Sequence, residues 1–262
     1  MEMYAHFHRP VRAAVVLAAS LSLAACATTA RPGAVSTSRM GVVKGPGIVA
    51  AGVVQLEAGY VHADRGERTR DVFGEALLRV GLGRDTELRA TLPSYLRVET
   101  PAATTRGASD AVLAVKHRFR QPAGWLPGVS LTVGSTLPTG ADAVGAGEAQ
   151  PEASAAAEWR LPHRLALVAI GGHRAAVFQG DRFGQSTLGA AGRADLAAAV
   201  ATQLEYSRVL STRAGAADLG QLRATAALRL TRDLQLDGWV GRVTQEGVPA
   251  ETQLGLGITR RW

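Results

Sequence analysis

The sequence predicts an all-β fold: a closed, antiparallel, up-and-down transmembrane β-barrel of about 12 strands, preceded by a cleaved signal peptide. Three observations predict it. Apolar and polar residues alternate with a period of two along most of residues 52–262. The alternating segments are long, and every second connection between them is a short turn, as in outer-membrane barrels. The final residue, Trp262, continues an apolar face.

The composition limits the function classes open to this chain. It has 262 residues, of which 47% are hydrophobic, 5% aromatic and 19% charged. The high aliphatic content excludes a disordered chain, and a single cysteine excludes a disulfide scaffold or a multi-cysteine zinc site. No His, Asp or Glu residues have a recognisable metal-ligand spacing, so no metal and no cofactor are expected. The net charge is +7, but the arginines are scattered among acids, so no nucleic-acid partner is expected.

The first 25 residues have the pattern of a secretory signal. Arg9 and Arg12 precede a small-apolar run over residues 13–25. That run is too short to cross a bilayer as a helix, which needs about 20 residues. A basic start, a short apolar stretch and small residues after it are typical of a signal peptide, and we expect one over residues 1–25.

The signal ends in a sequence that resembles a bacterial lipobox, Leu23-Ala24-Ala25-Cys26. This pattern predicts lipid attachment at Cys26, the one cysteine of the chain. Ordinary cleavage after Ala27 or Ala30 is the alternative. Residues 26–51 mix Gly, Pro, Ser, Thr and Val without a period, so we expect a flexible linker lying outside the fold, followed by the barrel over residues 52–262.

The alternation is clearest after residue 70. From Asp71 to Leu82 the even positions are apolar or glycine, whereas the odd positions include Asp71, Glu75 and Arg79. Comparable alternation, in places weaker, gives 12 expected strands. They cover residues 54–62, 72–82, 88–96, 111–119, 129–137, 153–159, 164–178, 182–192, 196–210, 222–230, 234–240 and 254–262.

The expected connections fall into two classes. Short turns are predicted at residues 83–85, 121–124, 161–163, 193–195 and 231–233, and longer loops at residues 97–109 and 138–149. An even number of strands with short turns at one end and longer loops at the other is typical of barrels in the bacterial outer membrane. We therefore expect an exported protein of a Gram-negative outer membrane, in contact with lipid and lipopolysaccharide.

The polar faces of such a barrel point into its lumen. Two interpretations of the charged residues remain open: a charge-selective or substrate-binding pore, or a salt-bridged filling that satisfies buried charges. The expected lumen-lining residues are Glu57, Asp71, Glu75, Arg79, Glu87, Arg89, Lys116, Arg118, Arg120, Glu158 and Arg160.

The end of the chain resembles the C-terminal signal that the barrel-assembly machinery of Gram-negative bacteria reads. Its expected residues are Trp262, Ile258, Leu256 and Leu254, on one face of the last strand. Arg260 departs from the pattern, because a hydrophobic residue is expected there. The low aromatic content also departs from the usual aromatic girdles, although the following aromatic residues fall near expected strand ends: Tyr60, Phe119, Trp125, Trp159, Tyr206 and Trp262.

Three stretches resemble a known family. They are Val54–Tyr60 at the first strand, Thr91-Leu92-Pro93-Ser94-Tyr95 followed by Gly107-Ala108-Ser109-Asp110, and Leu137-Pro138-Thr139-Gly140 followed by Gly145-Ala146-Gly147. Together they resemble the meta-pathway of phenol degradation family of outer-membrane barrels. The resemblance implies a transporter-like barrel for small, aromatic or hydrophobic compounds, and it implies no catalytic residues.

Three functions follow as expectations. The first is a passive conduit for small molecules, which is no enzyme. The second is a lipid-anchored structural or surface barrel with a filled lumen. The third is a barrel phospholipase or esterase, for which His173 and Ser186 flank the loop that holds Asp181; such enzymes need a serine, a histidine and an orienting polar group.

Overall fold

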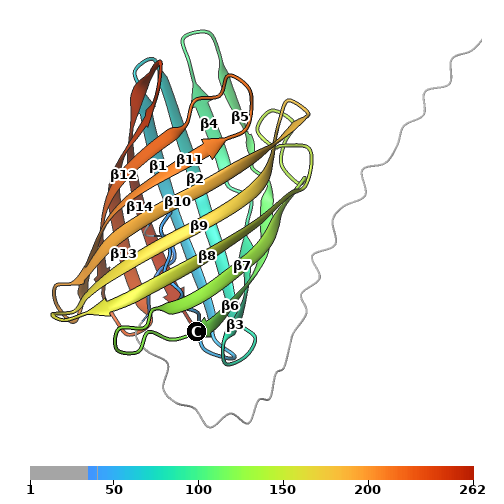
Figure 1. Ribbon diagram of the computed structural model, residues 1–262. Helices are drawn as coiled ribbons and strands as arrows, with labels where there is room; N and C mark the ends of the chain where they lie inside the picture. Colours follow the sequence, from blue (N-terminus) through green and yellow to red (C-terminus); the bar gives the residue numbers. More distant parts are fainter. Residues whose placement is uncertain (1–34, 40) are drawn as a thin grey trace, which may run out of the picture.

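The computed structural model describes residues 35–39 and 41–262, which form a β-barrel (Figure 1). The expected signal peptide and Cys26 lie outside the described residues. Within residues 35–39 and 41–262, no helix is long and apolar enough to cross a membrane.

The barrel wall is assigned as fourteen strands. They are β1 (Val54–Arg65), β2 (Arg68–Gly81), β3 (Thr86–Thr91), β4 (Tyr95–Glu99), β5 (Thr104–Ala108), β6 (Ala111–Arg120), β7 (Gly128–Leu137), β8 (Gln150–Leu161), β9 (Leu165–Phe178), β10 (Asp181–Asp195), β11 (Val200–Ser211), β12 (Leu219–Arg229), β13 (Leu234–Gln245) and β14 (Val248–Arg261).

Two crossings of the wall are each divided into two strands, so the barrel has twelve crossings as predicted. Both β3 and β4 pair antiparallel with β2, and they are separated by a break at Pro93. A proline has no backbone N–H to donate to the ladder, which interrupts pairing at that point. The next crossing repeats the division, because β5 pairs with β4 and β6 with β3.

The barrel is closed between its first and last strands. β1 pairs antiparallel with β2 on one side and with β14 on the other. Val54 and Trp262 exchange backbone hydrogen bonds of 2.9 and 3.3 Å at this seam. Closure joins the first crossing to the last, which is the condition for a β structure to span a membrane; only β5, which pairs with β4 alone, keeps an edge that no other described strand covers.

The connections differ from expectation at one loop. Residues 138–149 form the predicted long loop between β7 and β8, and Asp110 holds it by accepting hydrogen bonds from the N–H groups of Gly140 (2.7 Å) and Ala146 (2.8 Å). The loop expected at residues 97–109 is wrong in large part. β4 and β5 continue through it as a hairpin that stands above the rest of the wall (Figure 1), because Thr100 and Ala103 close a tight turn.

The two faces of the wall differ as the alternation predicts. Apolar side chains of β14 point outward, where Leu254 is 54% and Leu256 66% exposed. Outward aromatic residues gather at both ends: Tyr60, Phe73 and Tyr95 stack with ring centroids 5.1 and 6.3 Å apart. The other end exposes Phe119, Trp125 and Trp262. This arrangement fits an apolar belt between two aromatic girdles.

A bulge in β2 reverses the predicted facing of Asp71. Glu57 pairs with Leu77 but Gly59 pairs with Gly74, so β2 has one extra residue here, and Gly74 and Glu75 both have positive φ. The extra residue shifts the alternation by one. Asp71 therefore points outward, where it accepts hydrogen bonds from Tyr60 Oη (2.5 Å) and lies 2.9 Å from His62 Nδ1; it does not line the lumen.

Candidate functional site

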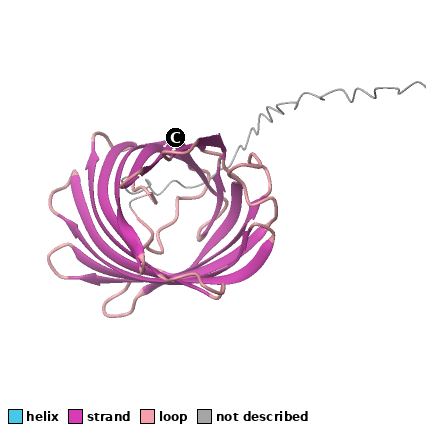
Figure 2. Cartoon of the chain, turned by 90° about the horizontal axis from the view of Figure 1, so that it is seen from above, coloured by secondary structure: helices cyan, strands magenta, loops and turns pink. Residues whose placement is uncertain are grey.

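The most distinctive feature of the lumen is a stretch of chain that precedes β1. Residues 35–39 and 41–53, here called the luminal segment, lie inside the barrel (Figures 1 and 2). Val35 donates to the carbonyl of Arg232 in the β12–β13 turn, and Gly81 at the end of β2 donates to the carbonyl of Val53. Both ends of the luminal segment are therefore at the same mouth of the barrel, the one with the short turns.

The expectation that residues 26–51 lie outside the fold is wrong for the described part of that range. Val35 and Val43 are 1% and 2% exposed. Val43 packs against Val168 and Ala191 on the wall opposite β1. The composition looks like a linker because the segment has no secondary structure, yet its backbone polar groups are satisfied by side chains of the wall.

Glu57 of β1 is the first of three carboxylates that hold the luminal segment. It is fully buried. One of its oxygens accepts hydrogen bonds from Thr37 Oγ1 (2.6 Å) and the Ser38 N–H (2.7 Å), and the other accepts from Gln55 Nε2 (2.8 Å) and Arg79 Nη1 (3.1 Å). The carboxylate is thus compensated by donors from both the wall and the segment.

Glu205 of β11 holds the middle of the segment from a different part of the barrel wall. It accepts from the N–H groups of Val42 (2.8 Å) and Val43 (3.1 Å), and from Gln203 Nε2 (2.9 Å). Gly41 is required beside it, because a Cβ there would lie 1.9 Å from Glu205 Oε2. A carboxylate that accepts hydrogen bonds from two adjacent backbone N–H groups fixes the path of the chain, whatever side chains those residues carry.

Glu87 of β3 holds the returning part of the segment. Its Oε2 accepts from the Val49 N–H at 2.8 Å. The same carboxylate pairs with Arg79 (2.8 Å) and Arg89 (2.6 Å). Lys116 of β6 complements it by donating to the carbonyls of Gly45 (2.6 Å) and Gly47 (3.1 Å). Anions of the wall therefore bind N–H groups of the segment, and cations of the wall bind its carbonyls.

The lumen-lining predictions divide into three groups by place. Five residues form one buried network with the luminal segment: Glu57, Arg79, Glu87, Arg89 and Lys116. Glu75 and Glu158 also reach the segment, the first by an ion pair with Arg39 and the second beside Gly45.

The remaining predicted residues lie nearer the mouth. Arg118 pairs with Asp85 at 2.7 Å, and Arg120 donates to the carbonyl of Pro127. Arg160 has a side chain 69% exposed.

The sequence reasoning missed Glu205 and Gln203. Both belong to the segment 196–210, whose alternation looked weak. Their signal was present, because Gln203, Glu205 and Ser207 alternate with outward Leu204 and Tyr206 in β11. A single acid at the polar positions of one strand does not reveal a partner that lies 162 residues earlier in the chain, as Val43 does.

Lys44 belongs to the luminal segment and pairs with none of the three carboxylates above. Its side chain keeps exposed surface within the lumen, although protein surrounds it. This enclosure lowers the pKa of the Lys44 ammonium, and the nearby Arg89 guanidinium lowers it further. Lys44 therefore loses its charge at a lower pH than a free lysine does.

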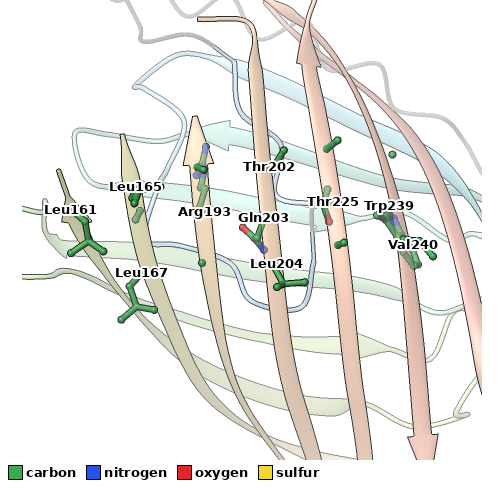
Figure 3. A pocket seen from close by; sticks show the side chains of 16 residues that line it. Leu161, Leu165, Leu167, Arg193, Thr202, Gln203, Leu204, Thr225, Trp239 and Val240 are labelled. Atoms are coloured by element: carbon green, nitrogen blue, oxygen red, sulfur yellow. The ribbon is translucent and has the colours of Figure 1, made fainter. Parts of the chain in front are cut away.

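The outer face holds two further features. A shallow groove of about 720 Å³ crosses the strands from β8 to β13 (Figure 3). Small outward residues such as Gly192, Ala224 and Gly238 form its floor, between larger residues such as Leu167 and Leu204. Its lining is almost wholly apolar and is continuous with the outer apolar belt.

The second outer feature is the pair His173 and Ser186. They are register partners on β9 and β10, and His173 Nδ1 lies 3.0 Å from Ser186 Oγ. Asp181 pairs with Phe178 at the hairpin end, five residues from Ser186, or about 17 Å along an extended strand. The structure thus brings two members of the expected triad together and leaves the third apart. Among residues 35–39 and 41–262, no group of three His, Cys, Asp or Glu side chains could hold a metal ion.

Comparison with known proteins identifies the fold. No protein-family model and no curated protein matches the sequence, so the family resemblance stays a prediction. Among solved structures, the COG4313 outer membrane channel from Pseudomonas putida F1 matches with a TM-score of 0.63 and 19% identity, over 87% of this chain and 100% of that one. The chain has the fold of an outer-membrane β-barrel.

Two porins share the same architecture at lower identity. The NanC porin matches with a TM-score of 0.58 and 7% identity, over 78% of this chain and 98% of that one. The KdgM porin in complex with disordered oligogalacturonate matches with a TM-score of 0.53 and 8% identity, over the same shares. At these identities the likeness concerns the fold.

Proposed function

We propose that this protein is a passive conduit for small molecules across the bacterial outer membrane, with a lumen restricted by the luminal segment. The observation that carries the proposal is the way the segment is held. The wall holds it through hydrogen bonds with Glu57, Glu205, Glu87 and Lys116, and such bonds can break and re-form. A closed barrel with a polar interior and a removable filling can pass solutes when the filling moves.

The proposed orientation follows from the two ends of the barrel. In outer-membrane barrels the short turns face the periplasm. The mouth where Val35 enters would then be periplasmic, and the β4–β5 hairpin extracellular. The same proposal includes export by a signal peptide over residues 1–25 and contact with lipopolysaccharide. It also includes insertion by the barrel-assembly machinery, which would recognise β14 and Trp262.

Lipid attachment at Cys26 is a separate part of the proposal with its own test. Mass spectrometry of the mature protein from membranes should find a lipidated cysteine as the first residue. A mature N-terminus at Thr28 or Arg31 would show ordinary cleavage and contradict it.

The proposed solutes are small aromatic or hydrophobic molecules. The resemblance to the phenol degradation family supports this class. Inside the barrel, Val61, Val72 and Trp239 form a buried apolar cluster against which Leu96 packs. This apolar part of an otherwise polar lumen wall supports the proposed class, with the partly buried Leu96 as the side chain that a solute can reach.

The conduit is tested by solute flux into lipid vesicles containing the purified full-length protein. The expected result is slow uptake by the wild type and faster uptake by Glu205→Ala, which removes the acceptor of two segment N–H groups. Folding is checked by heat-modifiable migration in electrophoresis. If neither protein raises permeability although both are folded, the proposal fails.

A second candidate is the structural barrel with a filled lumen. Complete burial of Glu57 and Glu87 favours it, because salt-bridged charges can simply fill space. It predicts that Arg79→Ala destabilises the barrel and that loosening the luminal segment never produces flux. The flux assay therefore separates the two candidates.

The 3.0 Å contact of His173 with Ser186 is the observation behind the hydrolase candidate. We propose that the pair has no catalytic role, since Thr86 and His117 form a similar outward pair at 2.9 Å. Phospholipid and ester turnover by the wild type, abolished in His173→Ala, would overturn this.

A further inference from the structure

Three arginines surround one carboxylate at the mouth opposite the one where Val35 and Trp262 lie. Arg65, Arg68 and Arg70 place nitrogen atoms 3.5, 3.9 and 3.2 Å from the carboxylate of Glu251, which is 6% exposed. Glu251 can neutralise only one of these three positive charges. In this group, here called the arginine cluster, the three guanidinium groups share Glu251 as the one carboxylate within 4 Å among the described residues.

The hydrogen bonds show that Glu251 does not engage all three arginines. Its Oε1 accepts from Arg70 Nη2 at 3.2 Å and from Gln253 Nε2 at 2.6 Å. The distances to Arg65 and Arg68 exceed those of a hydrogen bond. Arg65 Nε is buried and has no hydrogen-bond partner among the described residues. Glu251 thus leaves part of the donor capacity of the arginine cluster unused, and the side chains of Arg68 and Arg70 are 44% and 28% exposed.

An apolar layer lies directly below the arginine cluster on the same wall. Arg70 pairs with Ala63, and two residues further into the barrel Val72 pairs with Val61. Two residues of strand span about 7 Å. Val61 and Val72 pack with Trp239, which is 7% exposed. The wall therefore changes from cationic to apolar and aromatic over roughly the length of one small aromatic acid.

The indole N–H of Trp239 is a hydrogen-bond donor without an acceptor among the described residues. Its Nε1 is buried and has no hydrogen-bond partner among residues 35–39 and 41–262, whereas Arg223 Nε lies 3.9 Å from the carboxylate of Glu205. The Arg223 guanidinium lies 3.7 Å from the centre of the Trp239 ring. A buried donor without an acceptor is uncommon in proteins, and the Trp239 Nε1 donor belongs to the apolar layer below the arginine cluster. This observation is independent of the charge count.

We infer that the arginine cluster and the apolar layer of Val61, Val72 and Trp239 together bind organic carboxylates, with the carboxylate at Arg65 and Arg70 and the apolar body against Leu96, the partly buried side chain that packs on this layer. Guanidinium donors match carboxylate geometry, and burial of apolar surface against the layer favours an apolar or aromatic body. The inference deepens the proposed function, since it names a chemical class of solute for the same lumen.

Binding of benzoate to the folded full-length protein in detergent micelles tests the inference by titration calorimetry. Benzamide has the same ring without the charge and serves as the matched ligand. Benzoate should bind saturably and benzamide at least about tenfold more weakly, because a charge-assisted hydrogen bond is lost. Equal binding of the two ligands, or no saturable binding of benzoate, would overturn the inference.

Two sets of variants separate a binding role from a structural one. Arg65→Gln with Arg70→Gln should weaken benzoate binding about tenfold, whereas Glu251→Gln should strengthen it, because it removes the competing carboxylate. Arg208→Gln is the matched control, since Arg208 pairs with Asp218 and is 54% exposed. If the double variant and Glu251→Gln weaken binding alike while migrating as folded barrels, the arginines are only structural.

The binding test does not depend on permeation. A protein that binds benzoate but never raises vesicle permeability keeps the inference and refutes the conduit. A protein that conducts but does not distinguish benzoate from benzamide keeps the conduit and refutes the inference.

Discussion

The two halves of the lumen use the same residue types in opposite ways. In the half that contains the luminal segment, arginine and glutamate are matched: Arg79 bonds both Glu57 and Glu87. In the other half three arginines share Glu251. Matched charges hold a stretch of chain in place, whereas unmatched charges leave donors for a solute. The ratio of arginine to glutamate side chains, more than their total number, therefore distinguishes the half that holds the luminal segment from the half proposed to bind a solute.

The largest expected effect comes from breaking the matched half. Arg79→Ala leaves Glu57 and Glu87 buried without their shared partner, which should lower the free energy of unfolding by about 3–5 kcal/mol. Urea unfolding in detergent micelles measures it. Arg208→Ala removes an exposed pair and should lower it by no more than about 1 kcal/mol. Equal losses would show that the buried network has no special weight.

The next effect concerns the hold on the luminal segment. Glu205→Ala leaves the N–H groups of Val42 and Val43 without an acceptor, at a cost of about 1–3 kcal/mol. A loss of about 1.4 kcal/mol makes release of the segment about tenfold more frequent. Single-channel recording should show more openings. Glu251→Gln, in the unmatched half, should leave the opening frequency unchanged, and an equal rise in both would contradict the comparison.

A smaller effect should follow from adding a single methyl group to the segment. Gly41→Ala places a Cβ 1.9 Å from Glu205 Oε2, while a Cβ at Gly47 meets nothing within 4 Å. Overpacking costs about 1–3 kcal/mol, so limited proteolysis should cut the segment faster in Gly41→Ala. Gly47→Ala should behave as the wild type. Identical cleavage of the two variants would contradict the close contact between Gly41 and Glu205.

The smallest effect is expected outside the lumen. Asp71→Asn weakens the outward contacts with Tyr60 and His62, with an expected loss below about 1 kcal/mol. Reversal potentials in a salt gradient should not change, because Asp71 faces away from the pore. A shift in ion preference would put Asp71 back in the lumen.

The strand pattern could be predicted from the sequence because alternation is local. The facing of Leu234–Val240 and Leu254–Ile258 follows directly from it, as the exposed Leu236 and the buried Asp237 show. The facing of Asp71 could not be predicted, since one extra residue at Gly74–Glu75 reverses the alternation. A glycine inside a strand, as at Gly74, is a common bulge position, but the chain has 30 glycines, so the sequence does not show which one marks a bulge.

The candidate site could be predicted only in part. Glu57, Arg79, Glu87, Arg89 and Lys116 stand at the polar positions of clear strands. What they bind could not be predicted, because a segment without a period is held through its backbone by residues far along the chain. Glycine-rich composition looks the same in a linker and in a segment that must pass close to buried carboxylates, as Gly41 does.

The central claim, that the luminal segment restricts the conduit, can be tested by a reversible lock. A Cβ on Gly189 would lie 2.7 Å from Val43 Cγ2, so Val43→Cys with Gly189→Cys suits a disulfide between segment and wall. Single-channel conductance would be measured for this pair in the Glu205→Ala background, with Cys26→Ser. The account predicts raised conductance under reduction and a return to the wild-type level on oxidation. Conductance that does not respond to the lock would contradict it.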